Sequence, residues 1–235
     1  SATHGGDGFF LFAGNETLQK TGAGGCNDNL VYRNDFSHAA ANGIEATFSK
    51  GNRFIENILD ECEHGVWAGY SIDSVISGNI IRRCRNGVSI EHGRNNRIMD
   101  NTIENTERGV HLWWDNDEDL LASAFCKAND ACRSTDNIVT KNRFSQVKTG
   151  IHLMDDTRSR IGDNFFEDAE TPIRLQGRVD VLQLVLEPSL RGRVRNESPS
   201  EIIFQESFPS LPAVESMTSR QRERLEARRG RQDAM

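Results

Sequence analysis

The sequence has no long apolar run and no stripe of basic residues, and only 36% of it is hydrophobic. No segment approaches the roughly 18 apolar residues that a membrane-spanning helix needs, so no such segment is predicted. The net charge is −7, and no basic stripe crosses the chain, which argues against a nucleic-acid partner. A low hydrophobic fraction is typical of a solenoid with a thin core rather than of a compact globular domain.

The chain does contain a repeat of 22 residues. Asparagines recur 22 or 23 residues apart, with one longer gap of 41, at positions 34, 57, 79, 101, 142 and 164. A second series keeps the same period and the same interruption: Gly43, Gly65, Gly87, Gly109 and Gly150, with Pro172 in the next slot. Two markers that share a period and an interruption indicate stacked units, none of which buries its apolar face alone.

Apolar residues keep this period and alternate inward and outward within each run, as Ile90, Leu112 and Leu153 illustrate. A period of two is that of a strand, so each unit holds about three short strands separated by turns. A leucine-rich repeat would need L-x-x-L-x-L in every unit, and that pattern is absent. The repeat therefore predicts a parallel β-helix, in which each strand pairs with its copy in the next coil.

Segments such as NRIMDNTIENTERGVHL and NIVTKNRFSQVKTGIHL resemble the right-handed parallel β-helix superfamily, which includes pectate lyases, many glycoside hydrolases and periplasmic NosD-like proteins. The resemblance covers roughly residues 5–180. It implies an all-β fold, a right-handed parallel β-helix of about seven coils, with an asparagine ladder. We expect residues 1–180 to form the solenoid and residues 181–235 to form an irregular extension with a charged helix over 219–231. The resemblance is specific for the fold and weak for activity.

The ends and the cysteines add three expectations. The first coil has no recognisable cap and no initiator methionine or signal segment precedes it, which predicts a piece of a longer protein and says nothing about its location. A secreted, periplasmic or cell-surface location is expected from the carbohydrate-active β-helix proteins that the sequence resembles. Cys62 and Cys84 share a small slot in consecutive coils and are expected to be buried thiols. Cys126 and Cys132 lie in an insertion of 19 residues and either stay free or close a short disulfide.

The asparagine series has a structural interpretation. We expect these residues to take the left-handed turn conformation and to hydrogen-bond from coil to coil. The outward positions after each glycine differ, because aromatics, histidines, acids and arginine share one face. Such a face suits a sugar polymer, and the predicted binding residues are Trp67, Trp113, Glu45, Tyr70, His92, Arg174 and Arg178. The alternative is a solvated face with aromatic pairing for stability.

Catalytic candidates lie on the same face: Asp115, Asp156, Glu91, His111 and His152. Asp115 and Asp156 are predicted to share a slot in consecutive coils, with Arg178 next in line. Two carboxylates this close share a proton, bind calcium, or pair with arginine. Calcium is therefore the cofactor left open, and no metal ligands are assigned. The lyases of the resembled superfamily use arginine or lysine as the base with calcium held by acids, which would suit Arg174 and Arg178.

The sequence thus predicts a protein that binds a polysaccharide and cleaves it, as a glycoside hydrolase or a lyase. The alternative is a non-catalytic carbohydrate-binding or structural module of a larger surface or periplasmic protein. Two carboxylates facing one gap would favour an enzyme, whereas a flat aromatic strip without them would favour a binding module.

Overall fold

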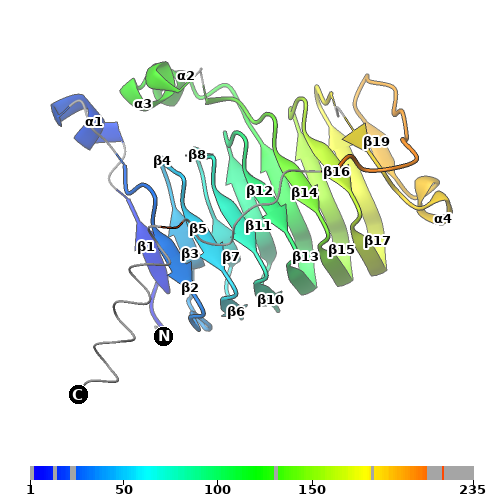
Figure 1. The fold of residues 1–235 in the computed structure, drawn as a ribbon, viewed down its shortest axis with the longest axis horizontal. Helices are drawn as coiled ribbons and strands as arrows, with labels where there is room; N and C mark the ends of the chain where they lie inside the picture. Colours follow the sequence, from blue (N-terminus) through cyan, green and yellow to red (C-terminus); the bar gives the residue numbers. More distant parts are fainter. Residues whose placement is uncertain are drawn as a thin grey trace.

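The protein is a stack of short strands joined by turns, seen in a computed structural model that describes residues 3–12, 15–21, 25–129, 132–180, 183–210 and 219. The strands pair in parallel with their counterparts one coil away and form a β-solenoid of about seven turns (Figure 1). The predicted all-β parallel β-helix is confirmed.

The strands of the described residues form three parallel sheets. The largest runs through β1 (Phe9–Leu11), β3 (Asn42–Ala46), β7 (His64–Trp67), β11 (Asn86–Glu91), β13 (Thr102–Trp113), β15 (Arg143–Met154), β17 (Phe165–Gln176) and β19 (Arg195–Glu197), and β13 also pairs with β10 (Ile80–Arg82), which pairs with β6 (Ile58–Asp60). The second comprises β2 (Leu30–Tyr32), β5 (Arg53–Ile55), β9 (Val75–Ser77), β12 (Arg97–Met99), β14 (Ile138–Thr140), β16 (Arg160–Gly162) and β18 (Gln183–Leu184). The third pairs β4 (Ser49–Lys50) with β8 (Ser71–Ile72).

The core is a set of apolar columns that run along the stack. Ile90 pairs with Leu112 and Leu112 with Leu153, and all three are fully buried. The glycine series has a steric cause, because a Cβ on Gly87 would lie 2.3 Å from the carbonyl oxygen of Gly109 in the next coil. These glycines therefore permit close approach of adjacent coils rather than an unusual backbone conformation.

The asparagine ladder is present, but its cause differs from the one predicted. Asn79 donates from Nδ2 to Oδ1 of Asn101 at 2.9 Å, and Asn101 donates to Asn142 in the same way at 2.9 Å. The left-handed residue is the one before each asparagine, for example Asp100 with φ 56°. The asparagines themselves point inward and satisfy buried amide and carbonyl groups, which only an amide side chain can do from both ends.

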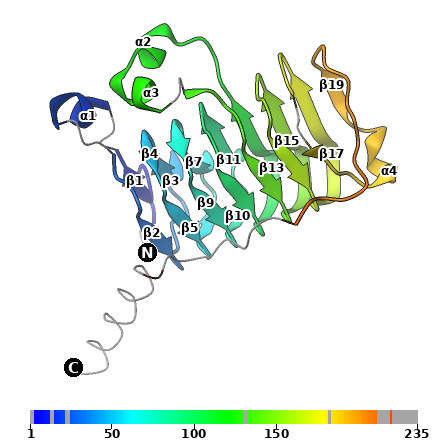
Figure 2. The same ribbon diagram turned by 45° about the horizontal axis from the view of Figure 1, so that its top comes forward.

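Short helices lie outside the stack: α1 (Asn15–Thr21), α2 (Glu118–Leu121), α3 (Ala124–Ala128) and α4 (Pro188–Arg191). Figures 1 and 2 show α1, α2 and α3 together beside the first coils, while α4 lies at the opposite end. The inserted segment carries α2 and α3 and packs Phe125 against Phe48, with ring centroids 5.6 Å apart. This contact makes a second, smaller hydrophobic cluster outside the solenoid core.

The cysteines follow the sequence analysis. Cys62 and Cys84 are buried free thiols, and Cys126 and Cys132 form a disulfide inside the insertion. Beyond residue 180, β18 and β19 add one short strand to each large sheet. The helix expected over 219–231 lies outside the described residues except for Ser219. No helix in the described part of the chain has the length and apolar character needed to cross a bilayer.

Candidate functional site

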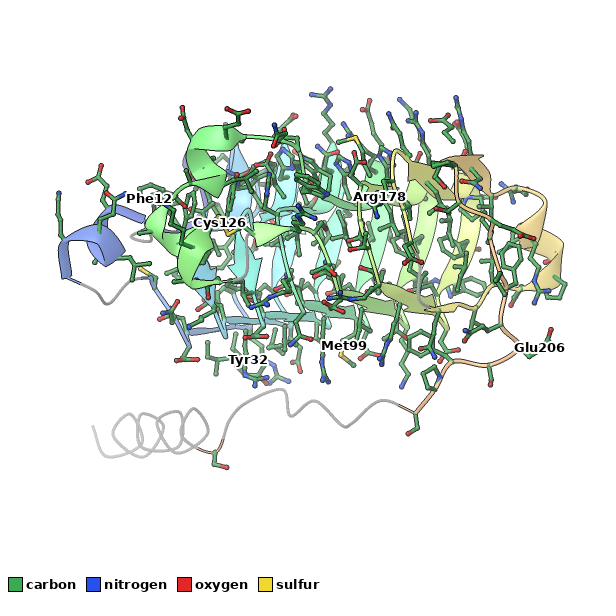
Figure 3. The ribbon with its side chains drawn as sticks, turned by 90° about the horizontal axis from the view of Figure 1, so that it is seen from above. Phe12, Tyr32, Met99, Cys126, Arg178 and Glu206 are labelled. Atoms are coloured by element: carbon green, nitrogen blue, oxygen red, sulfur yellow. A yellow bond between two sulfur atoms is a disulfide. The ribbon has the colours of Figure 1, made fainter. Side chains whose placement is uncertain are left out.

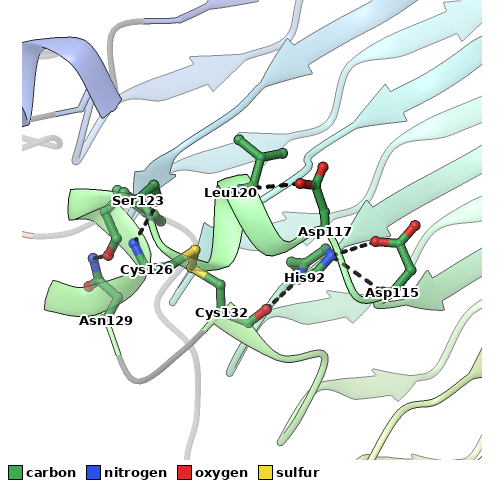
Figure 4. The surroundings of a disulfide bond; sticks show 9 residues. His92, Asp115, Asp117, Leu120, Ser123, Cys126, Asn129 and Cys132 are labelled. Atoms are coloured by element: carbon green, nitrogen blue, oxygen red, sulfur yellow. Dashed lines mark hydrogen bonds and ion pairs between the residues drawn. A yellow bond between two sulfur atoms is a disulfide. The ribbon is translucent and has the colours of Figure 1, made fainter.

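Glu91, His92 and Asp115 meet at the edge of the largest sheet, where the inserted segment begins. Glu91 ends β11 and pairs with Trp113, the last residue of β13, so the residues that follow each strand emerge side by side. His92 takes the left-handed conformation, with φ 53°, which turns the chain out of the strand. Figure 4 shows Asp115 beside the His92 ring and Cys132 on the other side of that ring.

His92 is held on every side and is only 1% exposed. Its ring stacks on Tyr70 with centroids 4.6 Å apart, and it meets the Trp114 ring in a T-shaped contact with centroids 6.0 Å apart. Nδ1 lies 2.6 Å from the carbonyl oxygen of Cys132, the residue that the disulfide ties to Cys126. Because a carbonyl can only accept, Nδ1 must carry the proton and donate it.

The opposite nitrogen, Nε2, faces a carboxylate. It lies 3.1 Å from Oδ1 of Asp115, and the backbone N–H of Asp115 donates to it over a longer 3.3 Å. With Nδ1 protonated, a neutral ring presents a lone pair from Nε2 toward an oxygen that also only accepts. The backbone N–H of Asp115 donates weakly to that lone pair, and a proton or a metal ion between Nε2 and Oδ1 would make the contact more favourable.

Glu91 supplies a second carboxylate. Its side chain, that of His92 and that of Asp115 each offer one ligand atom, and these three atoms lie within 4.8 Å of one another. Burial raises the pKa of Glu91, the nearby His92 opposes that rise, and Asp115 adds to it. One imidazole nitrogen and two carboxylate oxygens form a donor set that suits a divalent first-row ion, whereas copper(I) prefers sulfur ligands.

The predicted pairing of Asp115 with Asp156 is wrong in its geometry. The insertion follows Asp115 directly, so the slot below Asp156 is filled by Ser134, whose hydroxyl donates to Oδ2 of Asp156 at 2.7 Å. Asp156 is fully buried, and burial raises its pKa to about 7. Asp115 instead has a side chain 60% exposed at the start of the inserted segment. The acid that accompanies Asp115 is Glu91.

His111 and His152 of the sheet face were expected to be exposed to solvent, but both are buried. His111 stacks on Trp113 at 4.2 Å and on His152 at 4.5 Å, and both imidazoles are buried. Burial is the main cause that lowers the pKa of His111 to about 2 and that of His152 to about 4, and the charges of His152 on His111 and of Arg174 on His152 contribute to these values. Both rings are therefore neutral at neutral pH, and Nε2 of His111 is buried with no hydrogen-bond partner.

Trp67 and Trp113 form a partly exposed aromatic strip beside the cluster. Their ring centroids are 5.6 Å apart and the rings are tilted by 58°. Glu45, half-buried at the neighbouring coil, accepts a hydrogen bond from Asn42 at 2.7 Å, and burial and Asp7 raise its pKa. The strip and the cluster share Trp113 and Glu91 as paired neighbours across β11 and β13.

The remaining predicted binding residues separate into two groups. Tyr70 is buried and stacks between Phe48 and His92, so it packs against the ring of His92 and helps to fix its position in the cluster. Arg174 pairs with Glu197 of β19 at 2.8 Å. Arg178 donates its backbone N–H to Asp155 at 2.8 Å and, as Figure 3 shows, lies along the stack away from Cys126 and the inserted segment.

The joint cluster of Glu91, His92 and Asp115 is what the sequence analysis missed. Each residue was a candidate separately, but Asp115 was assigned to a repeat slot that it does not occupy. The position of the insertion, which starts at Asp115 just after β13 ends at Trp113, is the signal that could have identified it. A residue at the start of an insertion leaves the repeat geometry, so it meets the turn of the previous coil instead of its own copy.

Together, these features define a parallel β-helix protein with a histidine–carboxylate cluster at one edge of its longest sheet. Residues 21–127, a segment that contains the whole cluster, match the family described as periplasmic copper-binding protein (NosD). The chain is thus a parallel β-solenoid, as the repeat predicted, and it is similar to this family over those residues. No curated protein matches it.

Proposed function

We propose that the protein binds a divalent transition-metal ion, copper(II) in the first instance, through Glu91, His92 and Asp115. The position of His92 carries the proposal: Nδ1 is committed to the Cys132 carbonyl at 2.6 Å, which leaves Nε2 at 3.1 Å from Asp115 Oδ1, and a Glu91 oxygen completes a group of ligand atoms within 4.8 Å of one another. A backbone carbonyl that fixes the tautomer of a histidine is the usual support for a metal ligand. The family description names copper, and the nitrogen and oxygen donors of this set suit copper(II).

Asp115 offers the sharpest test, because its exposed side chain can be changed without disturbing the core. We expect Asp115→Asn to weaken copper(II) binding by at least tenfold in calorimetry, since loss of even a supporting residue costs about 10–100-fold in affinity. Asp119→Asn, an exposed acid of α2 in the same insertion, is the matched control and should bind as the parent does.

Adventitious copper must be separated from this site. His4 and His38 stack at 4.8 Å near the start of the chain and form a competing pair of imidazoles. Electron paramagnetic resonance of the His38→Ala variant should still show copper(II) with one imidazole nitrogen. Unchanged copper affinity in Asp115→Asn, combined with its loss in His38→Ala, would refute the assignment.

A second candidate function is polysaccharide binding along Trp67 and Trp113. The observation that favours it is the partly exposed strip of two tilted rings beside the half-buried Glu45 and Glu91. Aromatic faces bind pyranose rings, while acids bind their hydroxyls. A cleaving version of this function would use Glu91, whose raised pKa favours a protonated carboxyl, together with Asp115.

A polysaccharide panel distinguishes these possibilities. Reducing ends would indicate a hydrolase, absorbance near 235 nm would indicate a lyase, and binding without either would indicate a binding module. Trp67→Ala should lower retention on the bound polymer, whereas Phe165→Ala, an exposed aromatic at the start of β17, should not. Equal retention for both variants would contradict a role for the strip.

A further inference from the structure

Cys62 and Cys84 are free thiols in consecutive coils, at the opposite end of β11 from Glu91. The strand pairs on both sides of them, β6 with β10 and β7 with β11, run in matching register, which places the two cysteines directly opposite each other. The backbone N–H of Arg85 donates to the Cys62 carbonyl at 3.2 Å, so the two coils stay hydrogen-bonded here. The fold therefore fixes a pair of thiols side by side.

The two sulfur atoms point in the same direction, because each has the same surroundings in its own coil. Each thiol faces the carbonyl oxygen two residues earlier, at 3.5 Å for Cys62 and 3.4 Å for Cys84. Each also faces a carbonyl oxygen of the previous coil, that of Phe36 at 3.7 Å from Cys62 and that of Leu59 at 3.6 Å from Cys84. Adjacent coils lie about 4.8 Å apart, so the sulfur atoms are separated by about the same distance.

This spacing suits a bridging metal ion better than it suits a disulfide. A disulfide needs its two Cβ atoms about 3.5–4.5 Å apart, so the two coils would have to move together to form one. An ion midway between sulfur atoms about 4.8 Å apart lies about 2.4 Å from each, close to the roughly 2.3 Å of a metal–thiolate bond. Within the described part of the chain, no third histidine, cysteine or acidic donor groups with these sulfur atoms, so the four ligands that zinc requires are not supplied.

The surroundings of the pair favour a thiolate at Cys62. Interaction with the Cys84 thiol is the largest cause that lowers the pKa of Cys62, and backbone N–H groups of Ala39 and His38 lower it as well, against burial and the charge of Asp60. The same partner and burial raise the pKa of Cys84. The first proton therefore leaves from Cys62, and the thiolate is the form of cysteine that binds metals.

A surface groove of about 570 Å³ reaches the second cysteine. Cys84, Thr106 and Val147 line it from one slot in three consecutive coils. The hydroxyl of Thr106 is buried with no hydrogen-bond partner, so it is available to donate to the Cys84 sulfur once the thiol proton is lost. The groove thus gives a small cation a route to a sulfur atom that is otherwise buried.

We infer that Cys62 and Cys84 bind one soft monovalent metal ion, copper(I) or silver(I), between their sulfur atoms. Soft thiolate ligands select such ions. Two S–H bonds break, two sulfur–metal bonds form and both protons pass to water, so the step needs no oxidant or reductant. The site is separate from the cluster at the other end of β11, whose nitrogen and oxygen donors suit copper(II), and the inference does not rest on that cluster.

The test titrates copper(I) under nitrogen into the full chain in competition with bicinchoninate, whose copper(I) complex is coloured. No reductant is added, so that the disulfide of Cys126 and Cys132 stays closed. We expect the parent to withhold one equivalent of copper(I) from the chelator, and silver(I) to bind with the same stoichiometry in calorimetry. X-ray absorption at the copper edge should show two sulfur neighbours at about 2.3 Å.

Cys62→Ala and Cys84→Ala are the test variants, and both should fold, because alanine fills the same slot at Ala39 and Ala169. Circular dichroism melting checks this. We expect each to bind copper(I) at least tenfold more weakly than the parent. Cys26→Ala is the matched control, since it removes the third free thiol and should bind as the parent does. Equal copper(I) binding in the parent and both test variants, or no copper(I) withheld by the parent, would overturn the inference.

Discussion

The two sides of the solenoid use polar residues in opposite ways. On one side, Asn79, Asn101 and Asn142 bond to copies of themselves, so each coil repeats the contacts of the last. On the other side, the turn after the strand holds a different aromatic residue in each of three consecutive coils: Phe48, Tyr70 and His92. These rings stack with 4.6 Å between the centroids of each neighbouring pair. A polar residue repeated in every coil satisfies the hydrogen-bonding groups of the backbone in every coil. A column whose residue changes from coil to coil makes a different local environment in each coil, and the candidate site lies in such a column.

The largest effect is expected from breaking the repeated side. Asn101→Ala would remove the acceptor of the Asn79 backbone N–H and Nδ2 and the side-chain donor to the Ile76 carbonyl, whereas Oδ1 of Asn142 keeps the backbone N–H of residue 101. At 1–3 kcal/mol for each buried unsatisfied group, we expect a loss of about 4–6 kcal/mol in the free energy of unfolding, measured with urea. Asp100→Asn, on the exposed left-handed residue beside it, should cost less than about 0.5 kcal/mol.

The next effect concerns Asp156, the acid displaced from its predicted partner. Its pKa is raised from 3.8 to about 7 by burial, so the folded chain holds a proton that the unfolded chain releases above pH 4. Stability should therefore fall as the pH rises from about 4 to 7, by up to about 4 kcal/mol at 1.36 kcal/mol per pKa unit. Asp156→Asn should remove most of this slope, and an unchanged slope would show that another group causes it.

The structure of the repeated side could be predicted from the sequence. Its features recur in up to six coils, so one misassigned residue does not change the predicted pattern. The glycine and asparagine slots, the inward positions of Ile90 and Leu112, and the buried thiols are all found where expected. The candidate site could not be read in the same way. Asp115 sits where a 19-residue insertion starts, so counting in steps of 22 assigned it to a slot that Ser134 occupies. A periodic pattern predicts nothing about a residue that has left the period.

The disulfide closes a loop inside the inserted segment, whose Cys132 carbonyl contacts His92 of the changing column, and its removal should have a smaller effect. Cys126→Ser with Cys132→Ser frees the backbone around the Cys132 carbonyl, which accepts the hydrogen bond from His92 Nδ1. We expect copper(II) affinity to fall several-fold, because the tautomer and ring position of His92 are then less constrained. The melting temperature should change little, since the insertion packs outside the solenoid core. A large drop in melting temperature with unchanged affinity would reverse this assignment.

The smallest effect on stability is expected from Trp113, which covers His111 on the sheet face. The two rings stack at 4.2 Å, and burial keeps the pKa of His111 near 2. Trp113→Ala should admit water and move the pKa of His111 upward toward its ordinary value of 6.5, as followed by nuclear magnetic resonance titration of the ring protons. Trp67→Ala is the matched control, because Trp67 packs edge-on against His64 at 5.0 Å rather than on His111. If both variants leave the titration of His111 unchanged, His152 and the sheet rather than Trp113 bury this imidazole. The strip of Trp67 and Trp113 would then have no effect on the pKa of His111.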